Sequence, residues 1–135
     1  MRTCLITGGA GYIGSNLSRA LLDRGYEVVV VDDFSAGSYT NIEDLTSSEN
    51  FTVIEADFAD LEAYREPLGS ADYLFHLAGP VGVKNIVEAS PSSAERIEKH
   101  TAAVREMLEA TGSGLRSAFL ASSSEIYGQA EDGKP

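Results

Sequence analysis

The stretch TGGAGYIGSNL, residues 7–17, places Gly8, Gly11 and Gly14 at the spacing G-x-x-G-x-x-G directly after a run of apolar residues. A strand that ends in such a turn and leads into a helix is typical of dinucleotide-binding sheets, where N–H groups at the helix start bind phosphates. We expect Gly8 to permit the tight turn, Gly11 to let the backbone approach a pyrophosphate, and Gly14 to let the helix pack closely on the sheet. The alternative is a glycine turn with a structural role only.

Two aspartates follow the next apolar run, VVVV at residues 28–31. Asp32 would end the second strand, where an acidic side chain accepts hydrogen bonds from the adenosine ribose hydroxyls. Asp33 lies beside it, and no arginine or lysine is adjacent to the pair. Two carboxylates without a neighbouring cation would repel the 2′-phosphate of NADP. The sequence therefore favours NAD over NADP as the cofactor.

Short apolar runs alternate with amphipathic stretches along the whole chain, which is typical of βαβ units. The runs are partly β-branched, as in parallel strands that are buried on both faces. The five expected strands are TCLIT, YEVVVVD, NFTVIEA, DYLFHLA and SAFLASS, at residues 3–7, 26–32, 50–56, 72–78 and 117–123. We predict a Rossmann-type α/β fold with a doubly wound parallel sheet in the strand order 3-2-1-4-5. The cofactor would lie across the carboxyl ends of the strands.

Three helices are expected between the first four strands. The first begins after the glycine turn and ends before Gly25, which is placed to terminate it. Two shorter helices are expected at residues 40–45 and 60–68, the second limited by Pro67. The apolar residues of the first helix recur at helical spacing and are Ile13, Leu17, Ala20 and Leu21.

The longest helix is predicted before the fifth strand. Ser92 and Glu95 form the pattern of a capping box at its start, and Gly112 would end it. Its apolar face is expected to hold Ala94, Ile97, Thr101, Val104 and Leu108.

Composition limits the possible function classes. A chain of 135 residues suits one domain, and no run reaches the roughly 18 consecutive apolar residues of a membrane span. The formal net charge of −11 disfavours nucleic acid and anionic membranes as partners, because both attract positive surfaces. Cys4 is the only cysteine, so we expect neither an internal disulfide nor a bound metal. Met1 leads directly into a strand without a signal peptide, and we therefore expect a cytoplasmic protein.

Five blocks occur in order along the chain: TGGAGYIGSNL, VDDFSAG, EADFAD, HLAGPVGV and SSSEIYG. In this order they resemble the extended short-chain dehydrogenase/reductase family, and the resemblance spans essentially the whole chain. Members of that family are NAD-dependent nucleotide-sugar epimerases, dehydratases and decarboxylases. The resemblance therefore implies NAD as the cofactor and a UDP-sugar or other nucleotide-sugar as the substrate.

The resemblance also implies cofactor contacts, carried over block by block. The pyrophosphate would contact Gly8, Gly11, Tyr12, Ile13 and Gly14, and a ribose would contact Asp32 and Asp33. The adenine would contact Asp57 and Phe58. The ribose and nicotinamide side of the cofactor would contact Leu77, Ala78 and Gly79. For Asp57, the residue type alone leaves open a carboxylate that caps a helix or closes a turn.

Catalytic roles implied by the resemblance fall on the last block. The family oxidises C4 of the sugar transiently: a tyrosinate takes the hydroxyl proton, a hydride passes to the nicotinamide, and a serine or threonine hydroxyl holds the sugar oxygen. Ser123 matches that hydroxyl residue. Glu125 matches the carboxylate of decarboxylases and 4,6-dehydratases, whereas Ser124 stands where dehydratases carry an aspartate. The pattern favours uronate decarboxylation, with 4-epimerisation second. By residue type alone, Ser123 would be a turn or cap residue and Glu125 a surface carboxylate.

Two features depart from the family pattern. His100 stands in the long helix where the family carries an asparagine that braces the catalytic tyrosine through water. The family's Tyr-x-x-x-Lys pair does not occur before Pro135. We therefore expect residues 1–135 to be the NAD-binding part of a longer enzyme, with the last strands and the substrate domain outside this chain. The full-length form would be a homodimer, as is common in the family. The alternative is a complete, non-catalytic NAD-binding module, although a fifth strand at the sheet edge would expose apolar surface.

Overall fold

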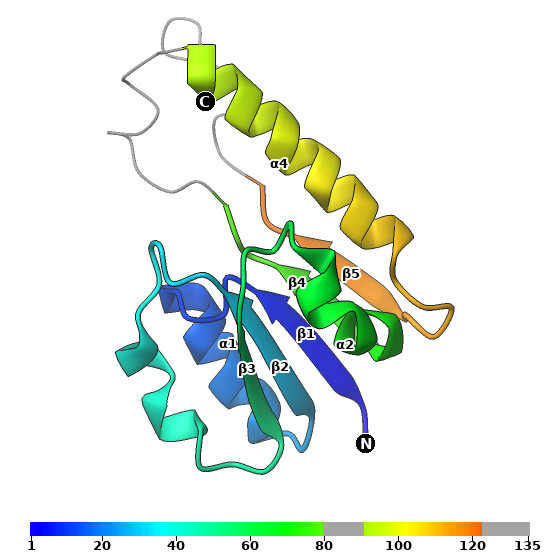
Figure 1. The fold of residues 1–135 in the computed structure, drawn as a ribbon. Helices are drawn as coiled ribbons and strands as arrows, with labels where there is room; N and C mark the ends of the chain where they lie inside the picture. The colour runs from blue at the N-terminus through cyan, green and yellow to red at the C-terminus, as the bar shows by residue number, and fades with distance from the viewer. Residues whose placement is uncertain (80–90, 123–135) are drawn as a thin grey trace, which may run out of the picture.

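Five parallel strands form the sheet of the molecule (Figure 1). The computed structural model describes residues 1–79 and 91–122, with side chains over 1–79 and 98–122. The strands are β1 (Thr3–Thr7), β2 (Glu27–Asp32), β3 (Phe51–Glu55), β4 (Tyr73–His76) and β5 (Ser117–Leu120). Their order is β3-β2-β1-β4-β5, and each neighbouring pair is parallel. The predicted sheet and its strand order are confirmed.

Helices lie on both faces of the sheet, which makes it doubly wound (Figure 1). α1 (Tyr12–Leu22) covers one face, whereas α2 (Arg65–Ser70) and α4 (Pro91–Glu109) lie on the other. The described 3₁₀ turns are η1 (Tyr39–Asn41), η2 (Glu43–Leu45) and η3 (Leu61–Tyr64). The chain reverses its direction of winding between β1 and β4. In open α/β sheets, the ligand site lies at this switch point, outside the carboxyl ends of the strands.

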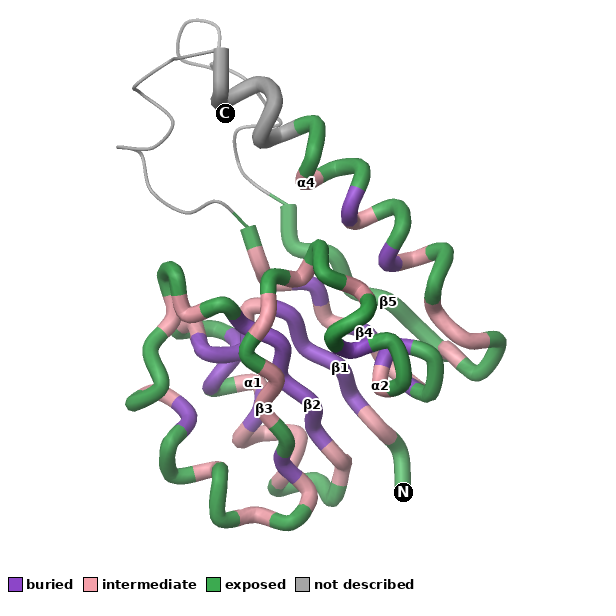
Figure 2. Tube along the Cα trace, in the orientation of Figure 1, coloured by how far each residue is buried: buried purple, intermediate pink, exposed green. Residues whose placement is uncertain are grey.

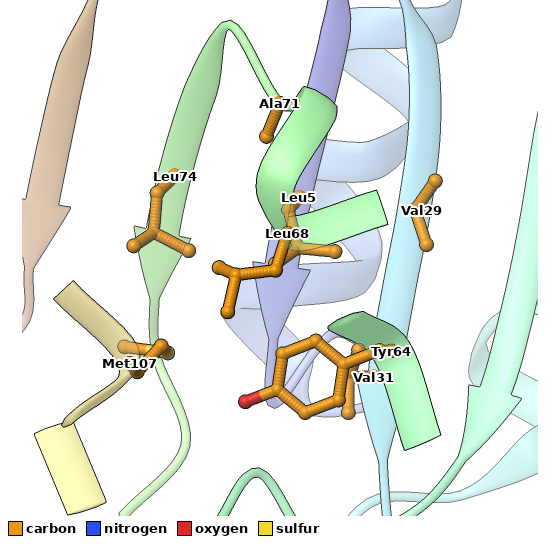
Figure 3. Packing of buried hydrophobic residues seen from close by; sticks show 8 residues of the cluster. All are labelled: Leu5, Val29, Val31, Tyr64, Leu68, Ala71, Leu74 and Met107. Atoms are coloured by element: carbon orange, nitrogen blue, oxygen red, sulfur yellow. The ribbon is translucent and has the colours of Figure 1, made fainter. Parts of the chain in front are cut away.

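Each face of the sheet carries its own hydrophobic core. The core beneath α2 and α4 consists of Leu5, Val29, Val31, Tyr64, Leu68, Ala71, Leu74 and Met107 (Figure 3). The core on the α1 side consists of Ile6, Ala10, Val28, Val30, Ile42 and Phe51. Alternate residues of β1 and β2 point to opposite faces, so both strands need continuous apolar runs.

The buried face of α4 differs from the predicted one. Ala103 and Met107 are buried, with 8% and 0% of their surface exposed, whereas Thr101 is exposed. Val104 and Leu108 are partly buried, as expected for neighbours of that face. The buried face is therefore rotated by about a third of a turn from the predicted one, because the helix packs through Met107 against the core over β4. No helix in the described part of the chain is long and apolar enough to cross a membrane.

The start of α4 also differs from the prediction. The helix begins at Pro91, so Ser92 lies inside the first turn and not before it. Proline suits the first helical position because its missing N–H has no intrahelical acceptor there. The side chains of Ser92, Ala94, Glu95 and Ile97 lie outside the described residues.

Three other helix boundaries test the sequence-based expectations. Gly25 follows α1 with a φ of +78°, and the predicted helix stop is confirmed. Residues 40–45 form two 3₁₀ turns and not an α-helix. The expected helix at 60–68 is divided into η3 and α2, and Pro67 falls within the first turn of α2. Because proline is tolerated there, α2 continues to Ser70 and Pro67 does not limit it.

The β5 edge of the sheet exposes apolar side chains. All four residues of β5 are exposed, and Phe119 and Leu120 have 54% and 43% of their surface accessible (Figure 2). Phe75 of β4 contacts Phe119, with the ring centroids 6.4 Å apart. The expected exposure of a fifth strand at the sheet edge is therefore observed.

Candidate functional site

Gly8 forms the turn that follows β1 at the carboxyl end of the sheet. Its φ of +74° lies in the left-handed region that favours glycine. Its N–H donates to the carbonyl oxygen of Val31 at 2.8 Å. A Cβ on Gly8 would lie 2.6 Å from the backbone nitrogen of Ala78, which follows β4. Glycine is therefore needed both for the turn, as predicted, and for the close approach of two backbone segments.

Two more glycines, Gly14 in α1 and Gly9 in the turn before it, allow close packing around the glycine turn. A Cβ on Gly14 would lie 2.5 Å from the carbonyl oxygen of Gly8 and 2.6 Å from the Cα of Gly9. The predicted close packing at Gly14 is thus against the turn and not against a strand. Gly9 is the glycine that packs on the sheet, because its Cβ would lie 2.5 Å from both γ-carbons of Val30. Sequence reasoning missed Gly9, whose only signal was its place beside Gly8.

The start of α1 has the features of an anion site. Gly11 is the N-cap in an extended conformation, without a side-chain cap, and the first turn contains no acidic residue. Uncapped N–H groups at a helix start and the helix dipole both favour a bound phosphate. Tyr12 and Ile13 are 85% and 67% exposed. Ile13 therefore does not pack with the apolar face of α1, contrary to the sequence pattern.

Asp32 ends β2 in a buried position, with 8% of its surface exposed. Its Oδ2 accepts the N–H of Ala10 at 2.8 Å, and its Oδ1 accepts the N–H of Phe34 at 2.9 Å. A carboxylate oxygen can accept more than one hydrogen bond, so both Asp32 oxygens can still accept a ligand hydroxyl. The two backbone contacts fix the orientation of the carboxylate before any ligand binds.

Ala10 connects the glycine turn to the loop after β2. Its carbonyl oxygen accepts the N–H of Ser38 at 3.1 Å and the side-chain amide of Asn41 at 2.8 Å. A Cβ on Gly37 would lie 2.9 Å from the backbone carbon of Ala10. These contacts hold the loop against the turn. The sequence analysis did not identify Gly37, Ser38 or Asn41 as residues of the site.

Asp33 is exposed and accepts two hydrogen bonds from Ser35 at its Oδ1. The Ser35 hydroxyl lies 2.6 Å away and the Ser35 N–H 2.9 Å away. The hydroxyl contact first, and then the backbone contact, lower the pKa of the Asp33 carboxyl below its ordinary value. Asp33 is therefore negatively charged at neutral pH, beside Asp32.

A cavity of about 680 Å³ lies over the carboxyl ends of the strands. Its described lining residues are Gly8, Gly11, Tyr12, Val31, Asp32, Asp33, Ser35, Ala36, Gly37, Ala56, Asp57, Phe58, Ala59, Leu77, Ala78, Gly79, Lys99 and His100. All predicted cofactor residues are among them except Ile13 and Gly14. Lys99 is the only arginine or lysine among these residues, which also include three aspartates. The structure thus gathers ten of the twelve predicted cofactor residues around one cavity.

Asp57 and Phe58 follow β3 and form one wall of this cavity. The Oδ1 of Asp57 accepts the N–H of Ala59 at 2.9 Å, so Asp57 also closes a turn, as the residue type alone had suggested. The buried Tyr64 donates its hydroxyl hydrogen bond to the carbonyl oxygen of Phe58. These contacts fix the loop that presents Phe58 to the cavity.

Two histidines meet beneath that wall. His76 at the end of β4 is 3% exposed, and its Nδ1 lies 2.6 Å from the Thr7 hydroxyl. Its Nε2 lies 3.4 Å from Nε2 of His100, which lines the cavity from α4. The Phe58 ring packs on both imidazoles, with centroids 4.8 Å from each. Burial first, and then the neighbouring His100, lower the pKa of His76 from 6.5 to about 4.

We expect the low pKa of His76 to make the fold sensitive to acid. Because the folded state keeps His76 neutral, its contribution is fully present above pH 6.5 and is lost as the pH falls toward 4. From pH 7 to pH 5, the free energy of unfolding should fall by about 2 kcal/mol more in the wild type than in His76→Gln. Urea unfolding of both proteins at the two pH values measures this difference. Equal losses in the two proteins would contradict it.

The two predicted catalytic residues, Ser123 and Glu125, lie outside the described residues. Ser122, the last described residue, follows β5 at the same edge of the sheet as the cavity. Their roles therefore stay predictions.

The sequence profile of the NAD dependent epimerase/dehydratase family matches residues 4–135. The chain belongs to this family. The prediction of NAD is confirmed at the level of the family, whose description names this cofactor. Family membership also agrees with the resemblance that the five sequence blocks indicated.

Three similar proteins act on UDP-sugars according to their names. A UDP-N-acetyl-alpha-D-glucosaminuronate decarboxylase of Bacillus cytotoxicus is 39% identical over 128 residues, which cover 95% of this chain and 38% of that protein. UDP-glucuronic acid decarboxylase 1 of Danio rerio is 36% identical over 94% of this chain and 28% of that protein. The structure of a UDP-N-acetylglucosamine 4-epimerase from Methanobrevibacter ruminantium M1 matches with a TM-score of 0.81 and 27% identity, over 98% of this chain and 41% of that one. The chain thus spans less than half the length of these relatives.

The described residues fit the cofactor of the family. A Cβ would collide with backbone at Gly8 and Gly14, so the turn leaves bare backbone where a diphosphate approaches. The fixed carboxylate of Asp32 suits a ribose diol, and Phe58 offers an apolar wall. When bound, NAD supplies a hydride acceptor. The protein contributes the uncapped helix start and the oriented carboxylate that would hold it.

Proposed function

We propose that this chain is the NAD-binding domain of an enzyme that decarboxylates a UDP-linked uronic acid. The buried, doubly hydrogen-bonded Asp32 beside the glycine turn carries the cofactor assignment. The two decarboxylase relatives and Glu125 support the choice of reaction. The chain covers 38% and 28% of those relatives, which supports a further, substrate-binding domain in the whole protein. We also propose that the whole protein is cytoplasmic and forms a homodimer in which α4 contacts the partner subunit.

The chemistry needs a ketone next to the carbon that bears the carboxylate. Oxidation at C4 of a uronate makes a β-keto acid, whose C5–C6 bond breaks with loss of carbon dioxide. The electron pair of that bond passes toward the C4 carbonyl, and C5 then takes a proton. In the proposal, the Ser123 hydroxyl holds the C4 oxygen. Glu125 orients the departing carboxylate; it would act as a base at C5 only in the dehydratase reaction, where C5 loses its proton.

An activity assay on the protein expressed from its complete gene tests this proposal. With NAD and UDP-glucuronate we expect release of carbon dioxide, and Glu125→Gln should slow it by about 100-fold. Formation of UDP-galactose from UDP-glucose without carbon dioxide release would instead establish 4-epimerisation, which the epimerase structure favours as second candidate. NAD binding with neither activity would leave a non-catalytic NAD-binding module.

We expect the protein to bind NAD at least about tenfold more tightly than NADP. The 2′-phosphate would lie beside Asp32 and Asp33, and the hydrogen bonds of Ser35 keep Asp33 ionised. Isothermal titration with both cofactors at two salt concentrations measures the preference. Because exposed charges are screened by salt, the difference should narrow as the salt concentration rises. Equal affinities at low salt would contradict this expectation.

A further inference from the structure

A chain of polar contacts runs from the interior of the sheet to the cavity wall. It begins at the Thr7 hydroxyl on β1, passes through both ring nitrogens of His76 on β4, and ends at Nε2 of His100 on α4. Thr7 is fully buried and His76 nearly so, whereas His100 lines the cavity. The glycine turn and Asp32 form a different part of the site. The role of these two histidines is therefore a separate question.

The hydrogen-bond donors in this chain can be ordered from its buried end. Among the described residues, the Thr7 hydroxyl has one partner, Nδ1 of His76, at 2.6 Å. A buried O–H that donates to nothing is costly, so the hydroxyl donates and Nδ1 accepts. The proton of neutral His76 then lies on Nε2. This N–H faces Nε2 of His100, which must accept it, and the proton of neutral His100 therefore lies on Nδ1.

The surroundings keep both rings neutral. The Phe58 ring packs on both imidazoles, and His76 is buried beneath it. Burial also lowers the pKa of His100, and the nearby Asp57 carboxylate opposes this shift without reversing it. When both rings are neutral, the contact between Nε2 of His76 and Nε2 of His100 contains a single proton, the one on His76. The hydrogen-bond order that begins at Thr7 is thus kept at neutral pH.

We propose that Thr7 and His76 are positioning residues of the cavity, which hold His100 in its Nδ1–H tautomer so that this wall offers a hydrogen-bond donor to the ligand. The ligand class is the one in the proposed function, on which this inference rests. His76 directly precedes Leu77 and Ala78, which line the same part of the cavity. The acceptor is therefore an oxygen of the half of NAD that lies along β4, away from Asp32. A ring in the other tautomer would present a lone pair to that oxygen and repel it.

Replacing Thr7 by valine tests the inference, since valine keeps the shape and removes the hydroxyl. In the protein expressed from its complete gene, Thr7→Val should weaken NAD binding by about five- to tenfold, whereas Thr7→Ser should remain within about twofold of the wild type. Thr3→Val is the matched control: its hydroxyl lies on the same strand and donates to Glu27, far from the cavity. Thr3→Val should bind NAD like the wild type. Equal affinity of Thr7→Val and wild type would overturn the inference.

The tautomer itself is measured on the wild type, and variants serve only to assign its signals. Nitrogen NMR of histidine-labelled wild type separates protonated from unprotonated ring nitrogens, and spectra of His76→Gln and His100→Gln assign the signals. We expect protonated Nε2 in His76 and protonated Nδ1 in His100. An unprotonated Nδ1 in His100 would overturn the inference even if NAD binds. Absence of NAD binding by the wild type would instead overturn the proposed function, and the spectra would still decide the order of the protons.

Discussion

Asp32→Ala should weaken NAD binding by about 100-fold, which corresponds to about 2.7 kcal/mol. The carboxylate is the acceptor that the ribose hydroxyls would use, and hydrogen bonds to a charged group contribute about 1.5–3 kcal/mol each. Its orientation is set by Ala10 and Phe34 and not by the ligand, so little freedom is lost on binding. Isothermal titration with NAD measures the loss. The ratio of the dissociation constants for NADP and NAD should also fall, because one of the two carboxylates that repel the 2′-phosphate is removed.

The same substitution affects the fold, and controls must separate the two effects. Without Asp32, the N–H groups of Ala10 and Phe34 lose their acceptor, which should cost about 1–3 kcal/mol of stability. Asp44→Ala is the matched control, because Asp44 forms an exposed ion pair with Arg19 and has no contact with the cavity. It should bind NAD like the wild type. A folded Asp32→Ala protein with wild-type affinity for NAD would refute the role of Asp32.

The strand order could be predicted because its causes are local in sequence. Continuous apolar runs such as residues 28–31 mark strands buried on both faces, and the glycine turn after β1 marks the switch point. Gly8 and Gly25 were found for the same reason, since a positive φ at a chain reversal selects glycine. Asp32 followed from its place at the end of β2.

Features that depend on contacts between distant segments could not be predicted. The pairing of His76 with His100 joins β4 to α4, and neither residue carries a local signal for the other. Gly9 is explained only by Val30, which the parallel pairing of β1 and β2 brings near it. The buried face of α4 is set by how Met107 meets β4 and not by the apolar pattern alone.

Gly8→Ala should be the most damaging single substitution at the turn, with a loss of about 3–4 kcal/mol in the free energy of unfolding. The φ of +74° strains any residue that carries a Cβ, by about 1–2 kcal/mol. The added carbon would lie 2.6 Å from the backbone nitrogen of Ala78, and backbone cannot rotate away as a side chain does. The end of β4 would have to move from the turn, so NAD binding should fall with stability. Urea unfolding measures the first effect and titration the second.

Gly69→Ala provides the matched control for Gly8→Ala. Gly69 lies in α2 with helical geometry, and its added Cβ would meet nothing within 4 Å. Alanine favours a helix over glycine, so stability should stay equal or rise by up to about 1 kcal/mol. The two substitutions add the same atom, and only its surroundings differ. Equal unfolding midpoints for Gly8→Ala and Gly69→Ala would show that the turn tolerates a side chain, and the close approach of β4 to the glycine turn would then not be a constraint on this site.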